Sequence, residues 1–105
     1  MAARLQLDIP HRLVHEDAVA RVQALAEYYR NKHHAQVSWS GHTCSIAVRY
    51  LGLQVSGDAR VDPHGVHIEA VDPGFLLRKR AADYLRRRFE RYLDPATPLA
   101  ELPRK

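Results

Sequence analysis

Seven histidines are the residues in this sequence whose chemistry could most readily include metal binding. His11 and His15 are four residues apart, a spacing that places two ligands on one helical face, but Pro10 precedes them and the first helix is expected to begin near His15. No cysteine or carboxylate spacing supplies the further ligands that a metal ion needs. No glycine-rich phosphate loop or dinucleotide fingerprint occurs either. The sequence therefore predicts no metal and no cofactor.

Two other groups have side chains suited to catalysis. Cys44 falls in an alternating run with Ile46 and Val48, which places its thiol on a buried face as an inert small hydrophobe. His67 and Glu69 are two residues apart and share the open face of one strand, but such a pair on an exposed sheet is usually solvated. We therefore expect no catalytic residue and a protein that is not an enzyme.

Positive charge is concentrated in one segment of the chain. The net charge is +4, and residues 75–92 hold seven basic and two acidic residues, a net charge of +5. The rest of the chain holds nine basic against ten acidic residues. A partner attracted by charge is therefore expected to meet this segment.

The basic segment has the period of an amphipathic helix, and its polar face is a candidate anion-binding surface. The cations on that face are Lys79, Arg80, Arg86, Arg87 and Arg91. Cations at this spacing could neutralise phosphates of a nucleic acid or charges of another anion.

Two features of the same helix favour a solvated charged face over nucleic-acid binding. Both tyrosines, Tyr84 and Tyr92, fall on the apolar side, away from bases on which they could stack. Each acidic residue lies four positions from a basic one, which predicts ion pairs within the helix. The predicted pairs are Asp83 with Lys79 and Arg87, and Glu90 with Arg86.

The hydrophobic pattern changes between the period of strands and that of helices along the chain. It predicts strands over residues 5–9, 36–39, 44–50, 53–61 and 66–70, and amphipathic helices over 15–33 and 75–93. Each strand has one apolar face and each helix one apolar stripe. The fold class that buries them is α+β, a two-layer sandwich in which two helices cover one face of a mainly antiparallel five-stranded sheet, in the order β-α-β-β-β-β-α.

Length and composition fit one domain in a reducing compartment. The 105 residues are 46% hydrophobic and 27% charged, which is ordinary for a globular chain. We expect a cytoplasmic protein, because the one cysteine cannot form an internal disulfide and no run approaches the roughly 18 apolar residues of a membrane span. The domain is predicted over residues 1–94, and residues 95–105, with three prolines, are predicted to form a flexible tail.

Several local strings resemble the polyhydroxyalkanoic acid system family over about residues 5–93. They are His11-Arg12-Leu13 before a helix with Ala18, Val22 and Leu25-Ala26, then Trp39-Ser40-Gly41, Gly52, Gly57, and Gly74-Phe75-Leu76-Leu77. The resemblance implies this fold and a link to storage-polyester metabolism, and it carries over no catalytic residue.

On these grounds we expect a non-enzymatic interaction protein of the bacterial cytoplasm. Its partner would be the surface of polyhydroxyalkanoate granules, or granule proteins, met through the helical layer. Weak nucleic-acid or anion binding by the basic helix is the alternative hypothesis. A small ligand carrier, with a cavity between sheet and helices, is a further alternative.

Overall fold

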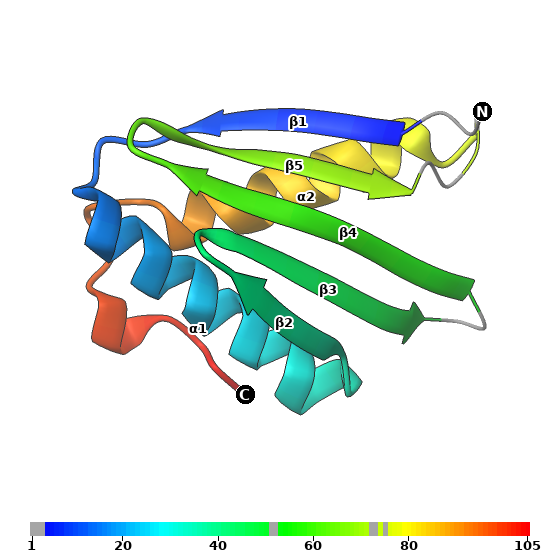
Figure 1. Ribbon diagram of the computed structural model, residues 1–105, viewed down its shortest axis with the longest axis horizontal. Coiled ribbons are helices and arrows are strands. Elements are labelled where there is room, and N and C mark those ends of the chain that lie inside the picture. The colour runs from blue at the N-terminus through cyan, green and yellow to red at the C-terminus, as the bar shows by residue number, and fades with distance from the viewer. Residues whose placement is uncertain (1–3, 51–52, 72–73, 75) are drawn as a thin grey trace.

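A computed structural model describes residues 4–50, 53–71, 74 and 76–105. The order of its elements is the predicted one (Figure 1). The elements are β1 (Arg4–Pro10), α1 (His15–His33), β2 (Gln36–Ser40), β3 (Thr43–Tyr50), β4 (Leu53–Asp62), β5 (Gly65–Val71), α2 (Arg78–Tyr92) and the short 3₁₀ helix η1 (Leu99–Glu101). The predicted turn at Gly52 lies outside the described residues.

The five strands form one antiparallel sheet in the order β1-β5-β4-β3-β2. Strands β2, β3 and β4 each pair with the next strand along the chain. β1 pairs instead with the last strand, β5, so that Leu7 lies opposite Ile68 and Asp8 opposite His67. The alternation of apolar residues predicted that β1 is a strand, but not its place at this edge of the sheet.

Both helices lie on one face of the sheet, behind it in the view of Figure 1. α1 packs on β2, β3 and β4, whereas α2 packs on β1 and against α1. The strand registers align apolar side chains in rows beneath these helices. One row is Trp39, Cys44, Ala59, Ile68 and Leu7. The core is therefore the single layer between sheet and helices, as the α+β prediction requires.

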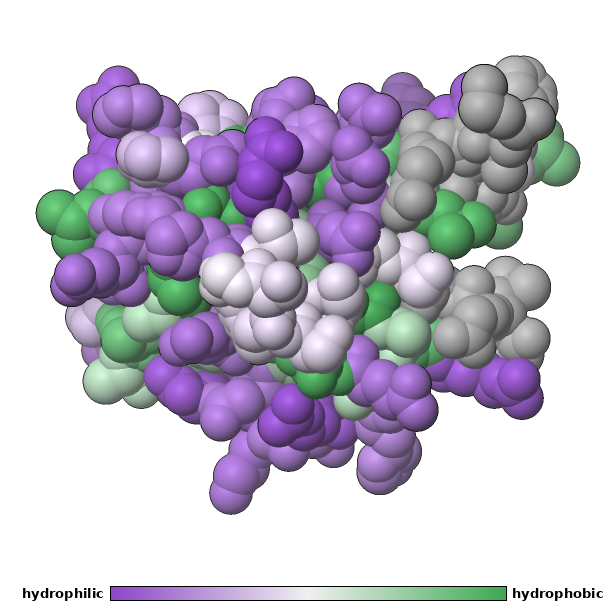
Figure 2. Space-filling model, in the orientation of Figure 1, coloured by the Kyte–Doolittle hydropathy of each residue, from purple (hydrophilic) through white to green (hydrophobic). Residues whose placement is uncertain are grey.

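In the part of the chain that the structure describes, no helix covers the opposite face of the sheet. Its middle row is Ser38, Ser45, Asp58, Glu69 and Gln6. Figure 2 shows this face as mostly hydrophilic, with residues of intermediate hydropathy near its centre. An antiparallel sheet with one face on the core and one in water alternates in this way along each strand.

α1 spans the predicted residues and is firmly buried along one side. Glu16 and Asp17 lie in its first turn, where negative charge is favourable near the helix dipole. The charged Arg21 is also buried, at 4% exposure. Its guanidinium donates to the carbonyls of Tyr92 and Asp94, so it ties α1 to the end of α2.

α2 begins three residues later than the predicted start at 75. Gly74 adopts a left-handed φ of 105°, and its carbonyl accepts hydrogen bonds from the backbone N–H groups of Leu77 and Arg78. The chain therefore makes a turn before the helix starts. Glycine suits this position because it has no Cβ to oppose a positive φ.

The segment 95–105, predicted as a flexible tail, packs against the domain. It forms η1, and the side chain of Leu102 is only 4% exposed within the core cluster. The Tyr92 hydroxyl donates to the carbonyl of Pro103 over 2.5 Å, and Arg104 forms a 2.7 Å ion pair with Glu27. The two leucines of this segment, Leu99 and Leu102, are three residues apart. So short an apolar pattern does not predict such packing from sequence. The mobility of the segment stays a prediction.

Candidate functional site

The five predicted anion-binding cations all lie exposed on α2. At about 100° per residue they fall into two neighbouring stripes. The first, here called the arginine stripe, contains Leu77, Arg80, Tyr84, Arg87, Arg88 and Arg91. The second, the mixed stripe, contains Lys79, Asp83, Arg86 and Glu90. Helical spacing along α2 therefore divides the predicted face: Arg80, Arg87 and Arg91 share one stripe, and Lys79 and Arg86 share the other with both acids.

The ion pairs predicted within α2 do not form among the residues that the structure describes. Neither Asp83 nor Glu90 has a basic nitrogen within the 4.0 Å of a salt bridge. The physical reason is that exposed pairs of long side chains gain little in water and lose side-chain entropy when they close. The argument from internal pairing against an anion-binding role is therefore weakened.

Of the two tyrosines predicted to point inward, one is half-exposed to solvent. Tyr92 is 1% exposed, but Tyr84 is 45% exposed. The hydroxyl of Tyr84 lies 3.0 Å from the hydroxyl of Tyr29 on α1. Burial, followed by this hydrogen bond, raises the pKa of Tyr29. The Tyr29 phenol therefore stays protonated at neutral pH, and the contact between the two hydroxyls joins the helices.

Arg88 lies between the helices, on the apolar side where its spacing places it. Its guanidinium carbon is 5.3 Å from the ring centre of Tyr28 and 5.5 Å from that of Tyr84. Both distances are in the range of cation–π contacts. This arginine is thus engaged in the fold, whereas Arg80, Arg87 and Arg91 are exposed to solvent.

The histidines near the start of α1 form hydrogen bonds with the backbone. The Nδ1 atom of His11 accepts from the N–H of Leu13, so its Nε2 carries the proton and donates to the carbonyl of Asp62 over 2.9 Å. His15 Nε2 donates to the carbonyl of Val61 over 2.8 Å. Across the described part of the chain, no group of three or more metal-ligating side chains is placed to hold an ion.

His67 and Glu69 share the open face as predicted, and the sheet adds a third member, Asp8. His67 Nδ1 is 2.7 Å from Asp8 Oδ1, and Nε2 is 3.3 Å from Glu69 Oε1. The hydrogen bond to Asp8, and then that to Glu69, raises the pKa of His67. When the ring is protonated, both nitrogens donate to carboxylates, and the imidazolium then has no free nitrogen to act as a base.

The predicted burial of Cys44 is confirmed. The residue has 0% exposure, and burial raises the pKa of its thiol to about 11. A thiol with so high a pKa is a poor nucleophile at neutral pH, because the thiolate is the reactive form.

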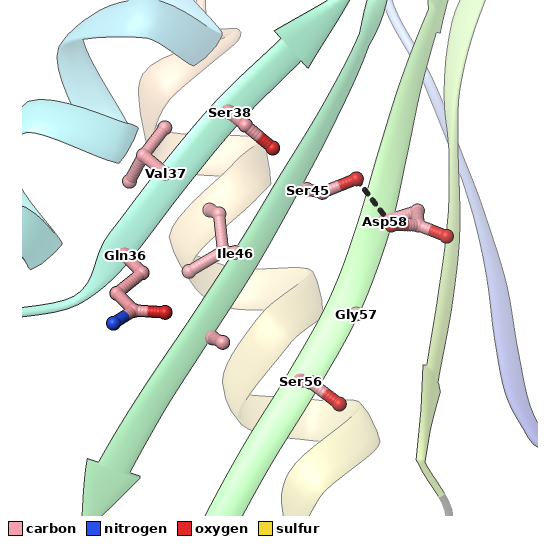
Figure 3. A pocket seen from close by; sticks show the side chains of 9 residues that line it. Gln36, Val37, Ser38, Ser45, Ile46, Ser56, Gly57 and Asp58 are labelled. Carbon is pink, nitrogen blue, oxygen red and sulfur yellow. Dashed lines mark hydrogen bonds between the residues drawn. The ribbon is translucent and has the colours of Figure 1, made fainter.

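A shallow hollow of about 320 Å³ lies on the sheet across β2, β3 and β4 (Figure 3). Small side chains form it, among them Ser38, Ser45, Ala47 and Ser56. The one carboxylate in its lining, Asp58, accepts a 2.7 Å hydrogen bond from the Ser45 hydroxyl. The hollow thus combines hydroxyl groups with an engaged carboxylate, which is not an acid–base arrangement.

The family model of the polyhydroxyalkanoic acid system proteins matches residues 5–96. The chain belongs to this family. The resemblance inferred from the sequence is thereby confirmed. No curated protein and no solved structure matches the chain.

The family match covers β1 from Leu5 onward, the rest of the sheet, and both helices, so both stripes of α2 lie within it. Leu102, which is buried in the core cluster, and Arg104, which pairs with Glu27 of α1, lie beyond it. Among the described residues, no helix is long and apolar enough to cross a membrane.

Two features of this family member could not be found from sequence reasoning. Asp8 joins His67 only because β1 pairs with β5 in this register. Tyr28 meets Arg88 only because the two helices converge on the same face. Neither contact has a signal in local spacing, since 59 residues separate Asp8 from His67.

Proposed function

We propose that this protein is a non-enzymatic interaction protein that associates with polyhydroxyalkanoate granules, or with proteins on their surface, in the bacterial cytoplasm. The match of residues 5–96 to the polyhydroxyalkanoic acid system family is the observation that carries the proposal. The helical layer is the surface that we propose makes the contact.

Exposed apolar residues support the choice of the helical layer. Leu76 is 86% exposed and Leu77 is 45% exposed, both just before α2 begins, and Tyr84, about two turns later, is also exposed. The open face of the sheet is polar, and its hollow is lined largely by small residues. Exposed apolar side chains beside cations suit an amphipathic surface better than a row of serines does.

Fractionation of cells that accumulate polyester granules tests the proposal. A tagged copy of the protein should sediment with the granules, and Leu76→Ser with Leu77→Ser should reduce the bound fraction. The matched control is Ser45→Ala with Ser56→Ala on the open face, which should leave the bound fraction unchanged. Uniform distribution of the wild-type protein in the soluble fraction would contradict the proposal.

The ligand-carrier alternative gains no support from the described hollows. One lies on the open face across β2 to β4, and the other lies at the sheet end around Pro10 and the turn at Pro63 and His64. Between sheet and helices the core contains closely packed residues such as Ala18, Leu25 and Cys44, each at most 1% exposed.

A further inference from the structure

The arginine stripe differs from every other charged surface of α2 because it contains no acidic residue. Asp83 and Glu90 both lie on the mixed stripe, beside Lys79 and Arg86. Arg80, Arg87 and Arg91 are exposed, and none forms an ion pair with another described residue. Three uncompensated cations thus point from one side of one helix.

The spacing of these arginines fits an extended anionic surface. Arg80 and Arg91 are eleven positions apart, which is about 16 Å along a helix at 1.5 Å per residue. A guanidinium donates two parallel hydrogen bonds to a phosphate and stays charged at every physiological pH. Several separate phosphate groups, presented side by side, could therefore be bound at once.

Apolar side chains at one end of the stripe distinguish the kinds of anionic partner. Leu77 begins the stripe and Leu76 precedes it, and both are exposed. A nucleic acid offers phosphates but no apolar region for two leucines. A lipid layer offers headgroup phosphates and, a few ångströms below them, acyl chains.

We propose that the arginine stripe docks on an anionic phospholipid layer, with Arg80, Arg87 and Arg91 at the headgroup phosphates and Leu76 and Leu77 at the acyl boundary. The inference rests on the proposed function for its cellular setting, because it names the chemistry of the surface that the helical layer meets. Arg88 and Tyr84 hold the stripe in place through their contacts with α1.

Vesicle sedimentation at about 0.1 M salt, where the Debye length is about 10 Å, tests the docking surface directly. The purified protein should bind vesicles of phosphatidylcholine with phosphatidylglycerol, and much less to phosphatidylcholine alone. Arg80→Gln with Arg87→Gln should weaken binding about 30-fold, since each cation near an anionic surface contributes roughly a fivefold gain. Absence of binding to the anionic vesicles would overturn the proposal.

The matched control is Lys79→Gln with Arg86→Gln on the mixed stripe, which removes the same charge from the same helix. We expect it to weaken vesicle binding less than about fivefold, because these side chains point away from the layer and their field is screened over a Debye length. Equal losses in the two double variants would mean that net charge alone drives binding, and would overturn the assignment to the stripe.

Leu76→Ser with Leu77→Ser separates lipid from nucleic acid. This variant should weaken vesicle binding while leaving any weak binding to duplex DNA unchanged. If wild type binds duplex DNA more tightly than anionic vesicles, and the leucine variant binds vesicles like wild type, the stripe is a nucleic-acid surface and the lipid proposal is wrong. Circular dichroism melting of every variant checks that the fold is retained.

The granule and vesicle experiments distinguish failure of the proposed function from failure of the lipid surface. Binding to anionic vesicles without sedimentation on granules would remove the proposed function and leave the lipid surface. Sedimentation on granules that the Arg80→Gln, Arg87→Gln variant retains in full would remove the lipid surface and leave the proposed function.

Discussion

α1 and α2 lie on the same face of the same sheet, yet seven of the 19 residues of α1 are buried and only two of the 15 residues of α2 are. α1 crosses β2, β3 and β4, while α2 lies along β1 at one edge and meets α1 from Tyr84 to its C-terminal end. The two amphipathic helices therefore have different structural roles. α1 closes the core, and α2 is anchored at Phe89 and Tyr92 and leaves its other side to solvent.

Truncation of core leucines should show this contrast most strongly. Leu25 on α1 is 1% exposed, and Leu25→Ala should lower the free energy of unfolding by about 3–5 kcal/mol because a cavity remains. Leu85 on α2 is only partly buried, so Leu85→Ala should cost less than Leu25→Ala. Urea denaturation measures both values, and a larger cost at Leu85 would break the comparison.

Substitution of Arg21 tests the hydrogen bonds that join α1 to the end of α2. Arg21→Met keeps the apolar stem but removes the donors to the carbonyls of Tyr92 and Asp94. We expect a loss of about 2–3 kcal/mol, since buried acceptors are left without partners. The control Asp17→Asn weakens only the 3.2 Å ion pair of Arg21 at the surface side, and should cost under about 1 kcal/mol.

The C-terminal segment should reinforce the same anchor. Leu102→Ala is expected to cost roughly 2 kcal/mol, the low end for a buried leucine, because it packs at the margin of the core. Amide hydrogen exchange should then quicken in α1 near Asn31, whose side chain donates to the Arg104 carbonyl. If neither stability nor exchange changes, the segment is the flexible tail that its composition predicts.

Substitution of His67 tests whether the stability of β1, the strand on which α2 packs, depends on pH. Its folded pKa is raised above the ordinary value of 6.5 by Asp8 and then Glu69. The protonated form therefore stabilises the fold fully below pH 6.5, and this contribution disappears as pH rises through the raised pKa. The protection factors of amides in β1, which exclude the intrinsic rise of exchange with pH, should fall over that window in wild type but not in His67→Gln. NMR titration of the imidazole gives the pKa, and a value below 6.5 would contradict the contact.

The smallest effect is expected on the outer side of α2. Arg87→Ala should change the free energy of unfolding by only a few tenths of a kcal/mol, because the side chain is exposed and unpaired with any described residue. Thermal or urea melting measures this. A loss above about 1 kcal/mol would show that the arginine stripe belongs to the fold and is not free for a partner.

Local sequence determined most of the architecture. Alternating residues such as Leu5, Leu7 and Ile9 can form only a strand with one buried face, and the turn at Pro63 and His64 follows from a proline that fixes φ. The separation of cations into an acid-free stripe and a mixed stripe also follows from spacing along α2, which no tertiary contact alters.

Tertiary structure decided what depends on distant partners. The antiparallel pairing of β1 with β5 brings Asp8 to His67, convergence of the helices brings Tyr28 to Arg88, and packing of the final segment buries Leu102. No local pattern along the chain predicts any of these contacts, because the residues that meet are far apart in the sequence. Only the sheet or the core brings them together. The sequence alone thus placed the charge on α2 and separated its two stripes, and only the fold decided that Arg88 lies against Tyr28 between the helices.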